Sequence, residues 1–178
     1  MNANFLAFTY KVPSEPSKNR VYIWRTIKDL GAVYLQQGVA LLPYKEDLCE
    51  ILQNLRKEVN SLGGKSTLSQ LSFINEEDEE NIILEFKQQI DEEYNEFEEN
   101  CQRLIYELDR ETESGKFKFS ELEENEEELK KFHRWYNKIT KRNYFNSESE
   151  DKSKKMFEKA KVRLQEYSEE VYKRDREE

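Results

Sequence analysis

Residues 5–43 read FLAFTYKVPSEPSKNRVYIWRTIKDLGAVYLQQGVALLP, and the order of elements in the N-terminal part follows from them. An apolar and aromatic run over residues 5–12 stops at Pro13, which is typical of a strand followed by a turn. Apolar residues then recur at helical spacing over residues 18–30, and Gly31 follows as a helix stop. Two short apolar runs, residues 32–36 and 39–43, flank Gln37-Gly38 and predict a β-hairpin.

The next residues complete this pattern. Residues 45–62 repeat apolar residues at helical spacing up to Gly63-Gly64, and residues 66–74 alternate as a strand does. The resulting order is strand, helix, strand, strand, helix, strand. This order predicts an α+β fold in which residues 1–75 form a ferredoxin-like βαββαβ domain. One face of such a sheet stays open, and we expect the helices that follow to cover it.

Beyond residue 75 the apolar spacing changes to three and four, over residues 83–108. This period is typical of a helix that packs along another helix, and it predicts one long helix over residues 76–113. Two further apolar stripes run through residues 122–139 and 156–171. We therefore expect residues 76–178 to form a charged helical extension: a long helix, a helical hairpin with the next one, and a C-terminal helix.

Charge is segregated along the chain, whose net value is -9. Residues 76–129 hold 5 basic and 22 acidic residues, whereas residues 130–163 hold 12 basic and 4 acidic ones. Two interpretations of the basic segment 130–163 stay open. It binds nucleic acid through basic residues interleaved with aromatic ones, or it packs against the acidic helix and neutralises it. The low sequence pI of 5.0 disfavours strong non-specific binding to DNA.

Two stretches of the N-terminal part are unusual enough to identify a family. Their specific residues are Tyr10, Lys11, Pro13, Ser14, Glu15 and Pro16, then Trp24, Gly31, Tyr34, Gln36 and Gly38. In this order and spacing they resemble the N-terminal domain of the ChrB chromate-resistance regulators. The resemblance is strongest over residues 5–64, and the helical remainder carries little signature.

The resemblance implies a regulatory role. ChrB proteins are encoded with chromate efflux systems and act as chromate-responsive transcriptional regulators. We therefore expect a DNA-binding regulator that responds to oxyanion stress. The 178 residues leave no room for the second, C-terminal domain of the family, so the chain is either a stand-alone relative, as we expect, or a truncated one. The alternative is a non-catalytic module for dimerisation or partner docking that does not bind DNA.

Two groups of basic residues are candidate DNA or anion contacts. The first group lies on the predicted helix over residues 18–30 and comprises Arg20, Arg25 and Lys28. The second lies in the basic segment and comprises Arg134, Lys138, Lys141 and Arg142. Lys and Arg side chains neutralise phosphate, but either group also suits a solvated helix face. We expect Trp24 and Tyr34 to lie in the core.

Enzymatic chemistry has little support in the sequence. The sole histidine, His133, has no ligand cluster around it, and Cys49 and Cys101 are far apart in sequence. Gly63-Gly64-Lys65-Ser66 lacks the upstream glycine of a phosphate-binding loop, and the first strand ends on Lys11 where a magnesium-dependent nuclease needs a carboxylate. We expect no catalytic residues, no metal, no cofactor, no signal peptide and no membrane segment, and hence a cytoplasmic protein.

Overall fold

The computed structural model describes residues 4–176. The elements in chain order are β1 (Phe5–Lys11), α1 (Ser17–Asp29), β2 (Val33–Gln36), β3 (Val39–Pro43), α2 (Glu46–Ser61), β4 (Lys65–Leu71), α3 (Glu76–Glu113), α4 (Phe119–Arg142) and α5 (Ser149–Asp175). They fall into two compact units, Met1–Phe86 and Lys87–Glu178, so the first turns of α3 belong with the sheet.

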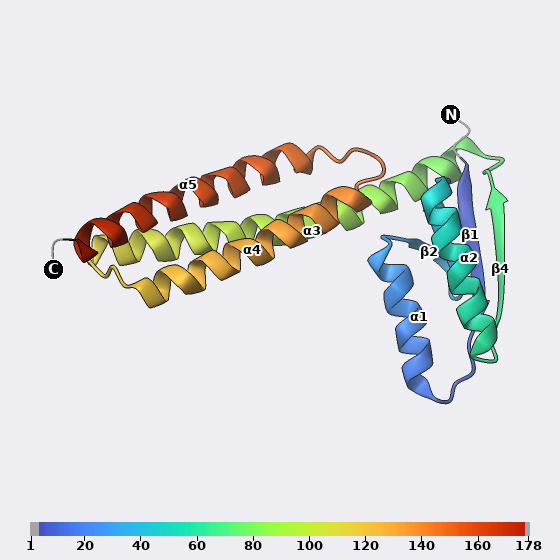
Figure 1. The fold of residues 1–178 in the computed structure, drawn as a ribbon. Coiled ribbons are helices and arrows are strands. Elements are labelled where there is room, and N and C mark those ends of the chain that lie inside the picture. The colour runs from blue at the N-terminus through green and yellow to red at the C-terminus, as the bar shows by residue number, and fades with distance from the viewer. Residues whose placement is uncertain (1–3, 177–178) are drawn as a thin grey trace. The chain divides into compact units, whose positions relative to one another are not determined.

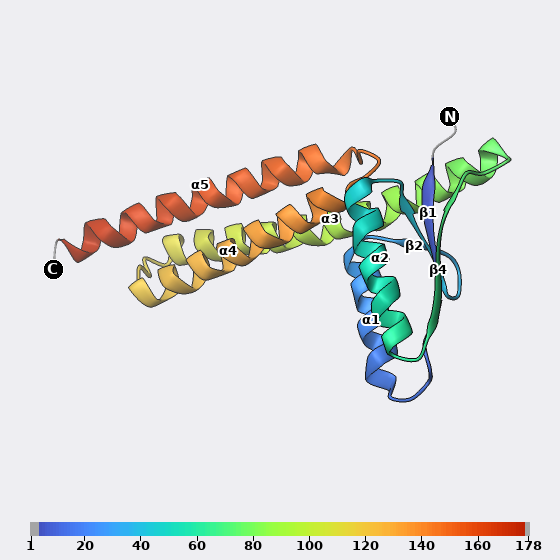
Figure 2. The ribbon, with the colours of Figure 1, turned by 45° about the vertical axis from the view of Figure 1, so that its right-hand side comes forward.

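The four strands form one antiparallel sheet in the order β2-β3-β1-β4. The expected α+β class, hairpin and element order are therefore confirmed. α1 and α2 lie on one side of this sheet in both ribbon views (Figures 1 and 2). The Ser66 hydroxyl of β4 points to the same side, because it lies 3.4 Å from the Arg56 carbonyl oxygen of α2.

The other side of the sheet is partly covered by the start of α3. The ring of Phe5 in β1 stacks on that of Phe86, with 6.4 Å between the centroids, and meets Phe73 edge-on at 5.6 Å. Ile82 is buried beside Phe86 on this helix, whereas Ile83 of the predicted stripe is only half-buried. The expectation that downstream helices cover the open face is confirmed for these turns.

The prediction that Trp24 lies in the core is wrong. Ile23 and Ile27 are fully buried on α1, whereas the Trp24 side chain is 46% exposed. One helix turn separates Ile23 from Ile27, so they form a narrow stripe, and Trp24 is rotated by about 100° from Ile23. Tyr34 is half-buried, and its hydroxyl lies 2.8 Å from that of Tyr10. Burial raises the pKa of Tyr34 above its ordinary value.

In the helical unit, α3, α4 and α5 share one core. α4 runs back along α3 after the turn at Gly115, as the expected hairpin requires (Figure 1). Phe97 is at the centre of an aromatic cluster: its ring centroid lies 5.4 to 6.0 Å from those of Phe132, Trp135, Tyr136 and Phe157. The predicted stripes supply most of this core. Within residues 4–176, no helix combines the length and the apolar character that crossing a bilayer requires.

Candidate nucleic-acid interface

One flank of α1 exposes a tryptophan among basic side chains. Arg20, Trp24 and Lys28 are each four residues apart, so they lie in line along the helix, and all three are exposed. The Nζ atom of Lys28 lies 5.0 Å from the centroid of the Trp24 ring, a cation–π contact. Arg25 is also exposed, next to Trp24 in sequence. We call Arg20, Trp24, Arg25 and Lys28 the α1 flank.

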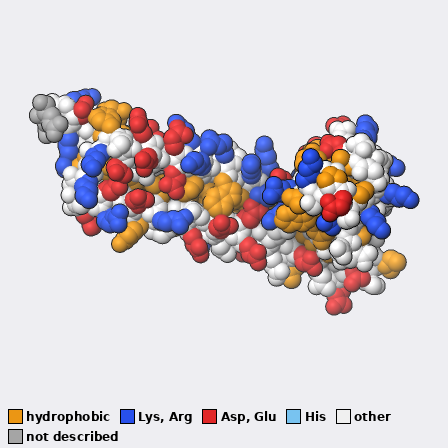
Figure 3. All heavy atoms as spheres, turned by 90° about the horizontal axis from the view of Figure 1, so that it is seen from below, with side chains coloured by type: hydrophobic (Ala, Val, Ile, Leu, Met, Phe, Trp, Pro, Cys, Tyr) orange, Lys and Arg blue, Asp and Glu red, His pale blue; other side chains and the backbone are white. Residues whose placement is uncertain are grey.

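The opposite side of α1 faces its neighbour α2. The Tyr22 hydroxyl donates a 2.8 Å hydrogen bond to Oε2 of Glu58, and this bond with the nearby negative charge raises the pKa of Tyr22. Tyr22 and Trp24 are about 200° apart around the helix axis. The bond to α2 therefore turns the α1 flank away from α2, and Figure 3 shows basic and hydrophobic side chains exposed together on the unit that holds the sheet.

The second predicted group divides between solvent and the helical core. Arg134, Lys138 and Lys141 are spaced by four and three along α4 and are exposed, so they form one basic stripe. Arg142 points elsewhere: its guanidinium lies 2.5 Å from Oε2 of Glu93 on α3, and only 15% of its side chain is exposed. The structure thus brings together three of the four predicted residues of this segment.

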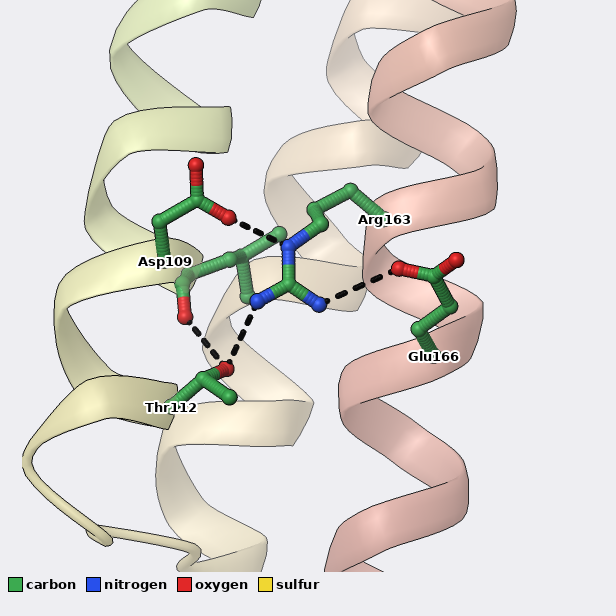
Figure 4. Close-up of polar contacts among 5 residues, drawn as sticks. Asp109, Thr112, Arg163 and Glu166 are labelled. Atoms are coloured by element: carbon green, nitrogen blue, oxygen red, sulfur yellow. Dashed lines mark hydrogen bonds and ion pairs between the residues drawn. The ribbon is translucent and has the colours of Figure 1, made fainter.

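Other ion pairs also link the basic segment to the acidic helix α3. Nζ of Lys152 lies 2.6 Å from Oε2 of Glu98, a carboxylate that is 8% exposed. The Arg163 guanidinium binds Asp109 and donates a 2.9 Å hydrogen bond to the Thr112 hydroxyl (Figure 4). The basic side chains that point inward therefore neutralise acidic residues of α3 within the helical unit. Among residues 4–176, no ion pair joins the exposed stripe of Arg134, Lys138 and Lys141 to α3.

The family-motif residues of the β1–α1 turn and of the β2–β3 hairpin lie at the end of the sheet where β1 ends, whereas Gly31 follows the other end of α1. Pro13, Ser14, Glu15 and Pro16 form the exposed turn between β1 and α1. Gly31 has a positive φ of 77° directly after α1, where a side chain would strain the backbone. Gln36 and Gly38 lie at the β2–β3 hairpin, and the carbonyl oxygen of Gly38 accepts a 3.0 Å hydrogen bond from the Tyr10 amide.

No cluster of side chains typical of a metal centre occurs in the part of the chain that the structure describes. Within residues 4–176, no three potential ligand side chains gather to hold a metal ion. His133 is exposed on α4, with its ring centroid 6.1 Å from that of Phe157. Cys101 is buried on α3, and burial raises the pKa of its thiol to about 12, which keeps it protonated and unreactive.

Comparison with known proteins gives one match. The model of the family described as "Protein ChrB, N-terminal" matches residues 20–178. The match includes the helical unit, in which the sequence shows little signature, and begins beyond the YKVPSEPS part of the motif. No curated protein and no solved structure matches the chain.

Proposed function

The chain belongs to the family of ChrB N-terminal domains, a membership that suggests a regulatory protein associated with chromate resistance, and from it we propose a DNA-binding transcriptional regulator that responds to oxyanions. The proposed contact with DNA is the α1 flank. The observation that carries this proposal is the exposure of Trp24 beside Lys28, Arg20 and Arg25. Exposing a tryptophan to water costs apolar burial, so a partner that covers its ring is favoured.

The chemistry of this surface suits nucleic acid. Arg and Lys neutralise phosphates, and an aromatic ring next to them packs on sugars or bases. Asp29 is the one carboxylate of α1, and the whole chain has a net charge of -9. Residues 1–75 have 9 basic and 6 acidic residues, so the part of the chain before α3 is basic within an acidic protein. The exposed stripe of Arg134, Lys138 and Lys141 is a second proposed phosphate contact.

The experiment is fluorescence-anisotropy titration with the duplex upstream of the protein's own operon, with and without chromate. Binding that weakens with chromate supports both parts of the proposal. If the affinity for the duplex does not change with chromate, the result supports the DNA contact and contradicts the oxyanion response. If the wild type does not bind this duplex in low salt, the proposed function is wrong.

A groove in the helical unit favours the alternative, a dimerisation module that does not bind DNA. It has a volume of 690 Å³ and lies between α4 and α5, with Leu129, Phe157 and Leu164 among its lining residues. Its rim carries both Glu126 and Lys161, and both signs are interspersed along the helical unit (Figure 3). A rim of mixed sign is self-complementary, so a second copy of the chain suits it. Sedimentation shows whether dimers form without DNA.

Two further points belong to this proposal. The element order and the strand order β2-β3-β1-β4 support a ferredoxin-like arrangement of the sheet unit. We also propose a non-catalytic role in the cytoplasm, because binding of DNA by neutralising side chains needs no reacting group.

A further inference from the structure

Lys11 and Lys65 lie opposite each other at one end of the sheet. They are paired residues in the antiparallel β1–β4 ladder, and Thr9 is paired with Thr67 one step further along the same side. Paired residues of antiparallel strands point to the same side, with their Cβ atoms about 5 Å apart. Two like charges are therefore held side by side, an arrangement that repels unless an anion lies between them.

These lysines line a hollow of 550 Å³ in the sheet unit, together with Thr9, Tyr10, Gln37, Gly38, Asn60, Ser66 and Thr67. No carboxylate of residues 4–176 lines it. Three other described pockets, by contrast, each include at least two glutamates. Neither Lys11 nor Lys65 has an ion pair or a side-chain hydrogen bond with any residue of 4–176. The hollow therefore offers two uncommitted ammonium groups and neutral hydrogen-bond donors.

Two glycines hold the walls of this hollow close together. Gly38 has a φ of +78°, and a Cβ there would come within 2.9 Å of the Tyr10 carbonyl oxygen. A Cβ on Gly64 would come within 2.6 Å of the Lys11 carbonyl oxygen. Both positions therefore require glycine, and the backbone packs directly against the strand that carries Lys11. Tyr10, Lys11 and Gly38 of the family motif therefore all line this hollow.

We propose that this hollow binds an oxyanion between Lys11 and Lys65, with the Thr67 hydroxyl and the Gln37 amide as further donors. The ligand is either a free inorganic oxyanion or a backbone phosphate of nucleic acid. The Lys11 and Lys65 side chains point to the side of the sheet opposite α1 and α2, since they are one residue out of phase with Tyr10 and Ser66. Tyr10, Ser66 and Asn60 line the hollow from the side of α2, so it lies around the end of the sheet. No residue of the α1 flank lines it, and it is therefore a separate site. Only its use in an oxyanion response rests on the proposed function.

The test is a sulfate titration of the full chain, without DNA, at constant ionic strength, followed by the ¹H–¹⁵N signals of Gly38 and Lys11. We expect saturable shifts in the wild type and in the control Lys57→Glu, which makes the same charge change on α2. In Lys65→Glu the affinity for sulfate falls about tenfold or more, because an attractive charge becomes repulsive. The variant stays folded, since Glu opposite Lys11 relieves the repulsion.

A second titration with a DNA duplex identifies the source of the anion. If Lys65→Glu also weakens duplex binding, the site takes backbone phosphate; if only the sulfate response is lost, it takes a free oxyanion. Absence of saturable shifts with both ligands in the wild type overturns the proposal. So does a Lys65→Glu variant that stays folded and binds sulfate as the wild type does. Should that variant unfold, Lys11→Gln replaces it under the same criteria.

Discussion

The Nζ atom of Lys28 lies 5.0 Å from the centroid of the Trp24 ring, on a flank of α1 where nearly half of the tryptophan is open to solvent. An amphipathic helix that only covered a sheet would place such a ring inward. The buried stripe of Ile23 and Ile27 already serves that purpose. The exposed pair is therefore free to take part in binding.

Replacement of Trp24 separates a binding role from a packing role. We expect Trp24→Ala to weaken binding to DNA about tenfold, the loss of roughly one stacking or cation–π contact. The free energy of unfolding changes by about 0.5 kcal/mol or less, as for other surface substitutions. Anisotropy and urea unfolding measure the two quantities. A variant that loses stability but binds DNA as the wild type does would show that Trp24 packs within the fold and does not contact DNA.

Substitutions at Arg142 and at its neighbours on α4 are expected to change different properties, the first stability and the second DNA binding. Arg142→Ala leaves Glu93 without its partner in a half-buried position and lowers stability by about 1–3 kcal/mol, typical for a hydrogen bond to a charged group. Lys138→Ala with Lys141→Ala leaves stability within about 0.5 kcal/mol and weakens DNA binding, because these side chains are exposed. Urea midpoints and anisotropy distinguish the two. If both variants are equally stable, the pair with Glu93 contributes nothing to stability.

Arg163 joins α5 to α3 through a fork of hydrogen bonds. Its guanidinium contacts Asp109, Thr112 and Glu166, and a lysine reaches only one of these partners at a time (Figure 4). Arg163→Lys is expected to cost about 1–2 kcal/mol in urea unfolding. The control is Lys130→Ala, whose ion pair with Glu127 is exposed and contributes little. Equal unfolding midpoints for the two variants would contradict this role of Arg163.

Glu111 makes the stability of the helical unit depend on pH. Burial raises the pKa of this carboxyl above 4.5, and its Oε2 atom has no hydrogen-bond partner among the described residues. In the folded state the proton is therefore held more tightly than in the unfolded state. This contribution to stability is present below pH 4.5 and is lost as the pH rises through the folded pKa.

The measurable consequence is a comparison of Glu111→Gln with the wild type. The variant has no charge to bury, so its Tm exceeds that of the wild type at pH 7. The difference shrinks as the pH falls toward 4, where the wild-type carboxyl becomes protonated in both states. Thermal unfolding from pH 4 to 7 measures it. A constant difference across this range would show that ionisation of Glu111 is not its cause.

Much of the fold could be predicted from the sequence. The spacing of Ile90, Tyr94, Phe97, Cys101, Leu104 and Leu108 predicted one helix face, and all of these residues are buried. Trp24 could not be placed, because α1 carries two overlapping apolar stripes and only the packed sheet selects Ile23 and Ile27. On α5, buried Phe157 was missed in favour of its neighbour Met156, which is partly buried.

The candidate sites were harder to predict. Their basic residues could be named, but not which of them turn inward. Arg142 is three residues after buried Ile139, so the helical period did contain a signal that it approaches α3. Lys11 and Lys65 lie opposite each other because of the register between β1 and β4. The two lysines are 54 residues apart in the chain, so no local sequence pattern predicts this pairing.

The salt dependence of duplex binding tests the central claim most directly, that the α1 flank contacts DNA. Two basic residues are removed from the flank, Arg20→Ala with Lys28→Ala, and two from α2 as a control, Arg56→Ala with Lys57→Ala. Each lost phosphate contact lowers the slope of log affinity against log salt by about 0.9. The account predicts that the flank variant binds more weakly with a slope smaller by about 2, while the control keeps the wild-type slope. Equal slopes for the flank variant and the wild type would contradict it.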